Sequence, residues 1–176
     1  MSHVEIVENL AGWEATFREG WLAHFEKTGE TRWDLYNRPD NKTAPGGPAI
    51  DLSKSRLGFI TTSGAYLDAS QESFDAPNLL GDYTIRTFPT ATPFSAIAYA
   101  HTHYDHTAVN EDPQVLMPLR HLEDMVGEGI IGELAPAVIS FCGYQPDVGR
   151  VVRETIPAVV AAAKAEAWHA ALLVPA

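Results

Sequence analysis

The sequence predicts an α/β fold with three layers, in which a mostly parallel sheet is covered by helices on both faces. Short apolar runs typical of strands lie at residues 56–62, 94–100 and 137–141, and segments with helical periodicity lie between and after them. Strands that alternate with helices favour parallel pairing, because a parallel connection needs a crossover that a helix usually supplies. With 176 residues, 45% of them hydrophobic, the chain can form one compact core.

We expect residues 1–54 to form a helix and an irregular arm that precede this core. Residues 10–27 carry large apolar side chains at spacings of three or four, as an amphipathic helix does. These side chains are Leu10, Trp13, Phe17, Trp21 and Phe25. The aromatic stripe predicts internal packing or a subunit contact, and in a non-catalytic scaffold subunit it would be the docking surface. Residues 29–54 contain several prolines and glycines, which favours a surface connector.

The α/β domain is expected over residues 55–176, beginning with a strand at 56–62 that a serine–glycine pair ends. Residues 83–88 alternate polar and apolar side chains, which is typical of a half-exposed strand. Residues 94–100 are apolar enough for a central strand of the sheet.

The same alternation continues through the second half of the domain. Residues 118–128 have helical spacing and end before a glycine, and residues 137–141 form the next predicted strand. An alanine-rich helix over 147–166 leads into a predicted buried strand at 170–174. Because α/β proteins place their working groups in the loops after parallel strands, functional residues are expected at these strand ends.

Composition excludes several classes of partner. The net charge is −11, from 23 acidic and 12 basic residues, which disfavours binding to nucleic acid or to an anionic membrane surface. No apolar run is long enough to span a bilayer, and the first residues lack the basic and apolar regions of a secretion signal. A single cysteine fits a reducing cytoplasm. A homo-oligomer is compatible with the sequence.

Residues 101–106, with the sequence HTHYDH, give the strongest local signal because they follow an apolar run. Their spacing resembles the metallo-β-lactamase motif, so a zinc-dependent hydrolase is an alternative function. The metal ligands would be His101, His103, Asp105 and His106. That fold normally brings further histidines from later strands, and only two more follow here. Locally hydrogen-bonded histidines and an active-site loop without metal are the other interpretations.

An ordered series of short motifs extends over about two-thirds of the chain. The series comprises LGFITTSGA at 57–65, Phe74, GDYTIR at 81–86, FP at 88–89, His101 with Tyr104 and Asp105, Asn110, Asp112, MPLRHL at 117–122, GII at 129–131, AP at 135–136 and FCGY at 141–144. In this order the motifs resemble the selenoprotein B family of glycine, sarcosine and betaine reductases, which includes the related D-proline reductase selenoprotein subunit.

The resemblance implies a subunit or fragment of a selenol- or thiol-dependent reductase. Such an enzyme cleaves a C–N bond in glycine, sarcosine, betaine, proline or a related amine. A selenolate or thiolate suits this reaction because it is ionised near neutral pH and remains nucleophilic. The resemblance also implies a partner reductase subunit that carries a pyruvoyl group, since no motif here resembles a carbonyl cofactor.

In the family, the strand that corresponds to residues 170–174 leads into selenocysteine or cysteine. We therefore expect selenocysteine directly after Ala176. A read-through stop codon, a split gene and a designed truncation would each explain a chain that is cut at this point.

Three residues of the histidine loop are the predicted catalytic residues: His101, Tyr104 and Asp105. They would orient the substrate or move protons beside the nucleophile, and histidine suits this because its pKa lies near working pH. No metal ligand is assigned in the reductase interpretation. Cys142, the single thiol, lies among apolar residues and is expected to be inert packing rather than a nucleophile.

A second set, Thr62, Ser63 and Gly64, is predicted to bind substrate. Their hydroxyls and backbone amides could meet a carboxylate, although simple turn formation explains the same residues. Arg86 and Arg120 could also bind a carboxylate through the planar guanidinium, with ordinary ion pairing as the favoured interpretation.

Overall fold

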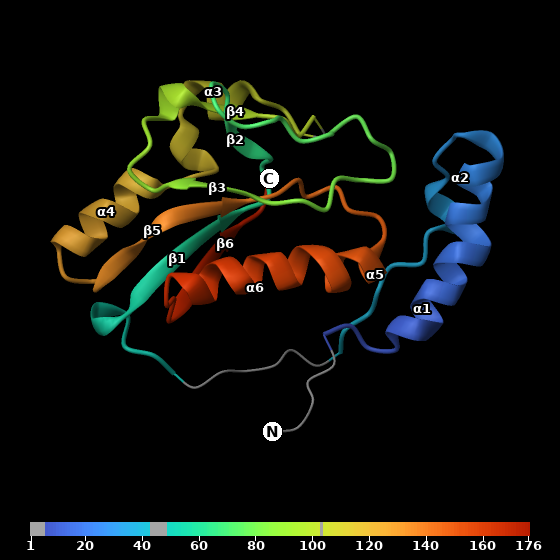
Figure 1. Ribbon diagram of the computed structural model, residues 1–176, viewed down its shortest axis with the longest axis horizontal. Helices are drawn as coiled ribbons and strands as arrows, with labels where there is room; N and C mark the ends of the chain where they lie inside the picture. The colour runs from blue at the N-terminus through green and yellow to red at the C-terminus, as the bar shows by residue number, and fades with distance from the viewer. Residues whose placement is uncertain (1–5, 43–48, 103) are drawn as a thin grey trace.

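The computed structural model describes residues 6–42, 49–102 and 104–176. In these residues the main sheet has the strand order β3–β5–β1–β6 (Figure 1). The strands are β3 (Arg86–Pro89), β5 (Glu133–Ser140), β1 (Arg56–Thr61) and β6 (Ala170–Val174). Strand β1 pairs in parallel with β5 and β6, and β3 is antiparallel to β5. The predicted α/β fold with a mostly parallel sheet is confirmed.

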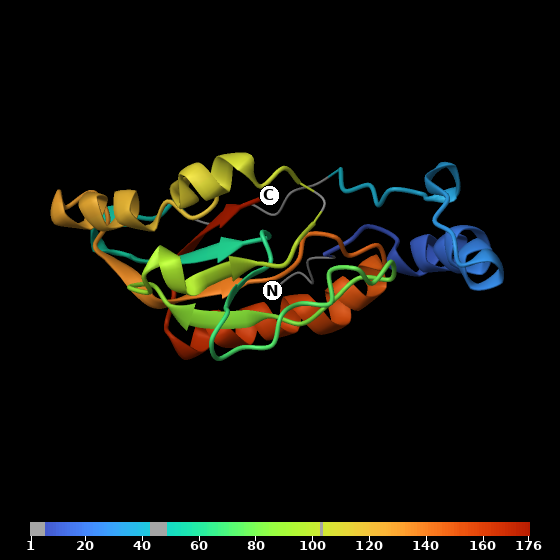
Figure 2. The same ribbon diagram turned by 90° about the horizontal axis from the view of Figure 1, so that it is seen from above.

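Helices lie on opposite faces of the main sheet (Figure 2). On one face, α4 (Leu119–Gly127) buries Leu119 and Leu122 against the apolar side chains of β1 and β5. On the other face lies a continuous helical segment made of α5 (Val148–Arg150), a π-helical turn (Val151–Thr155) and α6 (Ile156–Ala165). The helices predicted at 118–128 and 147–166 are thus confirmed, with the core between α4 and the sheet.

A small second sheet corrects the strand predicted at 94–100. Residues Phe94–Ala96 form a 3-10 turn, and only Ile97–Tyr99 form a strand, β4, which pairs antiparallel with β2 (Ala65–Leu67). Their apolar side chains pack over the main core from outside the main sheet. Apolar composition predicted burial, but it could not distinguish a strand inside the sheet from a segment that covers it.

The strand predicted at 83–88 is also displaced, because β3 begins only at Arg86. The Asp82 carboxylate accepts hydrogen bonds from the backbone N–H and the hydroxyl of Thr84, at 2.8 and 2.5 Å. This side-chain turn satisfies local backbone groups and competes with strand pairing.

The last strand, β6, forms as predicted and is in register with β1 from Leu57–Ala170 to Thr61–Val174. It is not fully buried: its residues alternate between half-buried and exposed, and Leu173 is 52% exposed, because β6 lies at the edge of the sheet. Gly58 allows the ring of Trp168 to lie directly against β1.

The N-terminal segment confirms the predicted helix over residues 10–27. It consists of α1 (Leu10–Phe17), a π-helical turn (Arg18–Leu22) and α2 (Ala23–Thr28), and it lies beside the sheet, at the right of Figures 1 and 2. The connector that follows is irregular where it is described, with 3-10 turns at Trp33–Leu35 and Leu52–Lys54. Across the described ranges, no helix has the length and apolar character needed to cross a membrane.

Candidate functional site

The carboxyl ends of β1, β5 and β6 meet at one edge of the sheet, where a cavity of about 440 Å³ opens. The loop after β4 reaches the same place and contributes His101. The cavity is lined by Thr62, His101, Phe141, Gly143, Tyr144, Pro175 and Ala176. Segments that are far apart in the sequence therefore build one concave surface, as expected at the ends of parallel strands.

Thr62 connects the three strand ends. Its backbone N–H donates to the carbonyl of Val174 at 3.2 Å, and its own carbonyl accepts from the N–H of Gly143 at 2.9 Å. Its Oγ1 accepts from the backbone N–H of Ala176 at 2.9 Å. The hydroxyl proton of Thr62 has no part in this bond and can still be donated to a ligand in the cavity.

Ser63 and Gly64 lie beneath this surface rather than on it. Ser63 is fully buried, and its hydroxyl accepts a hydrogen bond from Thr61 Oγ1 at 2.9 Å. Gly64 has a φ of 67°, and a Cβ there would lie 2.9 Å from the sulfur of Cys142. Of the three predicted substrate-binding residues, Thr62 lines the cavity, whereas Ser63 and Gly64 lie in the interior beside it.

His101 is buried, with 6% of its surface exposed, and faces the cavity beside Gly143. Its carbonyl oxygen lies 2.7 Å from Nε2 of His106, so His106 donates when that nitrogen carries the proton. The ring of Tyr104 stacks on His106 with centroids 4.4 Å apart, and lies 5.4 Å from the ring of His101. These contacts hold the histidine loop in a compact arrangement.

The Tyr104 hydroxyl donates a hydrogen bond to the carbonyl oxygen of Ser63, at 3.4 Å. Burial raises the pKa of Tyr104 well above its ordinary value, so the phenol stays protonated at neutral pH. It can donate a hydrogen bond, but it is a poor proton donor and, being protonated, cannot act as a base there.

Asp105 lies two residues before helix α3 (Thr107–Glu111), whose N-cap is His106. Its Oδ1 accepts from the backbone N–H and the hydroxyl of Thr107, at 2.9 and 2.7 Å, and these bonds lower the pKa of Asp105. An aspartate commonly accepts a hydrogen bond from the backbone N–H two residues later, and this local turn pattern could have indicated the contact. The structure thus brings His101 and Tyr104 together and shows Asp105 bonded locally.

The zinc-dependent hydrolase receives no support. His103 lies outside the described residues, and among those that are described no three His, Cys, Asp or Glu side chains are grouped to hold a metal ion. Cys142 is buried beneath the cavity, and burial raises the pKa of its thiol to about 12. A thiol with that pKa is a poor nucleophile at neutral pH.

The two arginines considered for carboxylate binding make contacts within the protein. Arg86 lies over the ring of Phe74 and donates to the carbonyl of Glu72 at 2.9 Å. Arg120 pairs with Glu123 and donates to the carbonyl of Thr90 at 3.0 Å. Within the described parts of the chain, the residues that line the cavity include no arginine or lysine.

Tyr144 and Gly143 are among the cavity residues that sequence reasoning did not assign to the site. Both belong to the loop after β5, and Tyr144 also borders the small space beside Cys142. Their place after an apolar strand was the available signal, since α/β folds put functional residues there.

Comparison with known proteins identifies the family of this chain. The family model "Glycine/sarcosine/betaine reductase selenoprotein B" matches residues 29–167. The chain belongs to this family. The matched segment contains strands β1, β3 and β5 of the main sheet and the histidine loop. Helices α1 and α2 precede it, and β6 follows it. The family resemblance predicted from the ordered motifs is confirmed.

Curated relatives of this family are subunits of reductases. The chain is 28% identical over 123 residues to the D-proline reductase subunit gamma of Acetoanaerobium sticklandii, a match over 70% of this chain and 49% of that protein. It is 29% identical over 119 residues to the sarcosine reductase complex component B subunit beta of Peptoclostridium acidaminophilum, over 65% of this chain and 27% of that protein. The chain thus spans about half or less of these relatives. No solved structure matches it.

Proposed function

We propose that this chain is a subunit or part of a selenol- or thiol-dependent reductase that cleaves a C–N bond in a small amine. Glycine, sarcosine, betaine, proline and related amines are the candidate substrates. Family membership and the names of the relatives support the class of enzyme. The observation that carries the proposal is that the end of β6 opens into the same cavity as His101, with Pro175 and Ala176 in its lining.

The residue that follows Ala176 in the complete protein is, in this proposal, selenocysteine or cysteine. A selenolate or thiolate there would supply the nucleophile that displaces nitrogen from the substrate carbon. The strand end suits such a group because its backbone is fixed by the bonds from Thr62 to Val174 and from Ala176 to Thr62. A fixed position matters because effective molarity depends on orientation.

The chain's own residues supply proton handling. The nitrogen departs with the electron pair of the C–N bond, and a primary or secondary amine must also gain a proton to leave, whereas the quaternary nitrogen of betaine leaves as neutral trimethylamine. His101 borders the cavity and suits proton transfer near neutral pH. The protonated phenol of Tyr104, close to the ring of His101, can donate hydrogen bonds but cannot withdraw a proton. Thr62 offers its hydroxyl proton to the substrate.

A partner subunit completes the site in this proposal. Among the described residues that line the cavity, none is an arginine or a lysine, and in this proposal the partner supplies groups that meet a substrate carboxylate. A partner that carries a pyruvoyl carbonyl would also activate the amine. The curated relatives are named as subunits of reductases and reductase complexes, which supports a multi-subunit enzyme. We propose a cytoplasmic location for it.

The test is reductase activity of the native complex, isolated from its source cells by a tag on this chain. Glycine, sarcosine, betaine and D-proline are each supplied with a dithiol as the two-electron reductant. C–N cleavage releases ammonia, methylamine or trimethylamine from the first three, and it opens the ring of proline. His101→Ala should abolish product formation, while His24→Ala, on the distant helix α2, should not.

Absence of cleavage with all four substrates, in a preparation that contains the co-purified subunits, would contradict the proposal. Sequencing the gene past codon 176 tests the nucleophile separately. A TGA or cysteine codon followed by in-frame sequence supports it, and unrelated sequence there removes it.

A further inference from the structure

The loop of residues 143–147 forms one wall of the cavity through Tyr144, and its outer side contacts the N-terminal segment. The ring of Trp33 meets the ring of Tyr144 edge to face, with centroids 6.0 Å apart and an interplanar angle of 82°. The Tyr36 hydroxyl donates to the carbonyl of Pro146 at 2.9 Å. Two residues of the N-terminal arm thus contact the loop behind the cavity wall.

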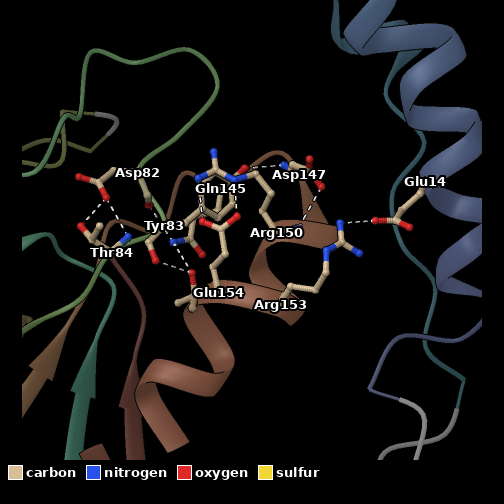
Figure 3. A network of polar contacts seen from close by, with 10 residues as sticks. Glu14, Asp82, Tyr83, Thr84, Gln145, Asp147, Arg150, Arg153 and Glu154 are labelled. Atoms are coloured by element: carbon tan, nitrogen blue, oxygen red, sulfur yellow. Dashed lines mark hydrogen bonds and ion pairs between the residues drawn. The ribbon is translucent and has the colours of Figure 1, made fainter. Parts of the chain in front are cut away.

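The same loop is fixed from its other side by residues 79–83. The Tyr144 hydroxyl donates to the carbonyl of Leu79 at 2.9 Å. Gln145 Nε2 donates to the carbonyl of Asp82 at 2.9 Å, and the N–H of Asp147 donates to the hydroxyl of Tyr83 at 2.7 Å (Figure 3). The loop of residues 143–147 is therefore held both by residues 79–83 and by the rings of Trp33 and Tyr36.

The two rings of the N-terminal arm are themselves held by contacts with the aromatic cluster of the N-terminal helix. Trp33 and Tyr36 both pack against Trp21, which is completely buried. Helix α1 is joined to the π-helical turn before α6 by the Glu14–Arg153 ion pair at 2.5 Å (Figure 3). Gly149 permits this approach, because a Cβ there would overlap the Glu14 carboxylate.

We infer that Trp33 and Tyr36 are positioning residues that act through Tyr144 and set the shape of the cavity wall. Trp33 and Tyr36 lie within residues 29–167, which the family model matches, whereas Trp21, against which both rings pack, lies before that segment. The N-terminal segment therefore supports the cavity wall from behind through these two rings. The consequence for catalysis depends on the proposed reductase function, whereas the positioning of Tyr144 does not.

The experiment reads the Tyr144 side chain directly, in the full chain and without substrate. Burial raises the pKa of Tyr144 above its ordinary value, so ultraviolet titration, with Tyr144→Phe subtracted in each background, reports how well the wall is packed. Trp33→Ala should shift this pKa down towards the ordinary value, and Trp33→Phe should restore it. Phe25→Ala, which disturbs the aromatic cluster but does not contact the loop, is the matched control and should leave it unchanged.

Tyr36→Phe provides a second variant that keeps the ring and removes only the bond to Pro146. It should also lower the pKa of Tyr144, by less than Trp33→Ala does. An unchanged pKa of Tyr144 in both Trp33→Ala and Tyr36→Phe, or an equal shift in Phe25→Ala, would overturn the inference. In the reductase assay, Trp33→Ala should raise KM more than it lowers kcat, because Tyr144 shapes binding. If the pKa of Tyr144 shifts as expected but no reductase activity is found, the positioning of Tyr144 is supported and the proposed function is contradicted.

Discussion

The N-terminal aromatic unit, residues 6–42, and the carboxyl edge of the main sheet are stabilised in different ways. In the first, stacked rings such as Trp13–Phe17, Phe17–Trp21 and Trp21–Phe25 come from residues four apart on one helix. In the second, single hydrogen bonds join distant segments, such as Ala176 with Thr62. The first region is therefore determined by local periodicity, and the second by the register of parallel strands.

This difference implies that the aromatic unit contributes mainly to stability, whereas the carboxyl edge of the sheet forms the candidate site. Ring stacking buries large apolar surfaces, so the aromatic unit should carry much of its stability in a few side chains. The strand edge has small polar residues whose individual contributions are modest, and its value lies in bringing Thr62, His101 and Tyr144 to one cavity. Substitutions in the two regions should differ accordingly.

The largest effect is expected for Trp21→Ala in the aromatic unit. Trp21 is completely buried between Phe17 and Phe25, and its loss should cost about 3–5 kcal/mol of unfolding free energy. Denaturant unfolding followed by circular dichroism measures this. Ile6→Ala, at a 48% exposed position in the same unit, should change the free energy by less than about 0.5 kcal/mol. Equal effects of the two substitutions would contradict the assignment of a buried aromatic core.

A smaller loss is expected for Gly58→Ala in the main sheet. The new methyl group would overlap the Trp168 ring, and such overpacking typically costs about 1–3 kcal/mol. Thermal or denaturant unfolding gives the change. Gly127→Ala, where an added Cβ meets nothing, should be neutral or stabilising. A destabilisation of Gly127→Ala as large as that of Gly58→Ala would show that the close approach of Trp168 is not the cause.

Thr62→Val should reduce stability only slightly, by about 0.5–1.5 kcal/mol, because it removes one hydrogen-bond acceptor. Its specific consequence is faster hydrogen exchange of the Ala176 amide, which loses its bond to Oγ1. Thr62→Ser keeps the acceptor and should retain the protection. If Thr62→Val leaves the exchange rate unchanged, the strand ends are not joined in this way.

Ionisation of the Cys142 thiol should have the smallest effect on the free energy of unfolding: none at neutral pH, and a measurable one only in alkali. Burial raises its pKa in the folded state to about 12, so the folded protein holds the thiol proton more tightly than the unfolded chain does. The resulting stability is fully present below the unfolded pKa, about 8.5, and is lost progressively as pH rises from there towards the folded pKa. Cys142→Ala should make the free energy of unfolding fall less steeply with pH in this range. Identical slopes for the two proteins would contradict a buried, protonated thiol.

The fold could be predicted from the sequence where periodicity is set by burial. The stripe from Leu10 to Phe25 and the apolar run at 137–141 gave the first helix and the core of β5 correctly. Residues 94–100 misled because the segment is apolar through covering the core, which composition cannot distinguish from lying within the sheet. The start of β3 depends on a side-chain turn at Asp82, which pattern reasoning did not include.

The site was predicted only as far as the strand ends. His101 was named because imidazoles are rare and conspicuous, and Thr62 because it lies at a strand end. Both line the cavity, and their roles stay predictions. Tyr144 was missed, since its role depends on contacts with Trp33 and Leu79, more than 60 residues away in sequence. Such contacts follow from strand register and loop packing, which a single sequence does not specify.

The central claim is that the end of β6 and His101 share one cavity, and a paramagnetic label tests it most directly. A nitroxide on Ala176→Cys, in a Cys142→Ala background, is combined with histidine-selective NMR of the full chain. We expect the His101 signal to be broadened strongly and the His24 signal, on α2 far from the carboxyl terminus in Figures 1 and 2, to stay sharp. A His101 signal as sharp as that of His24 would contradict the site described here.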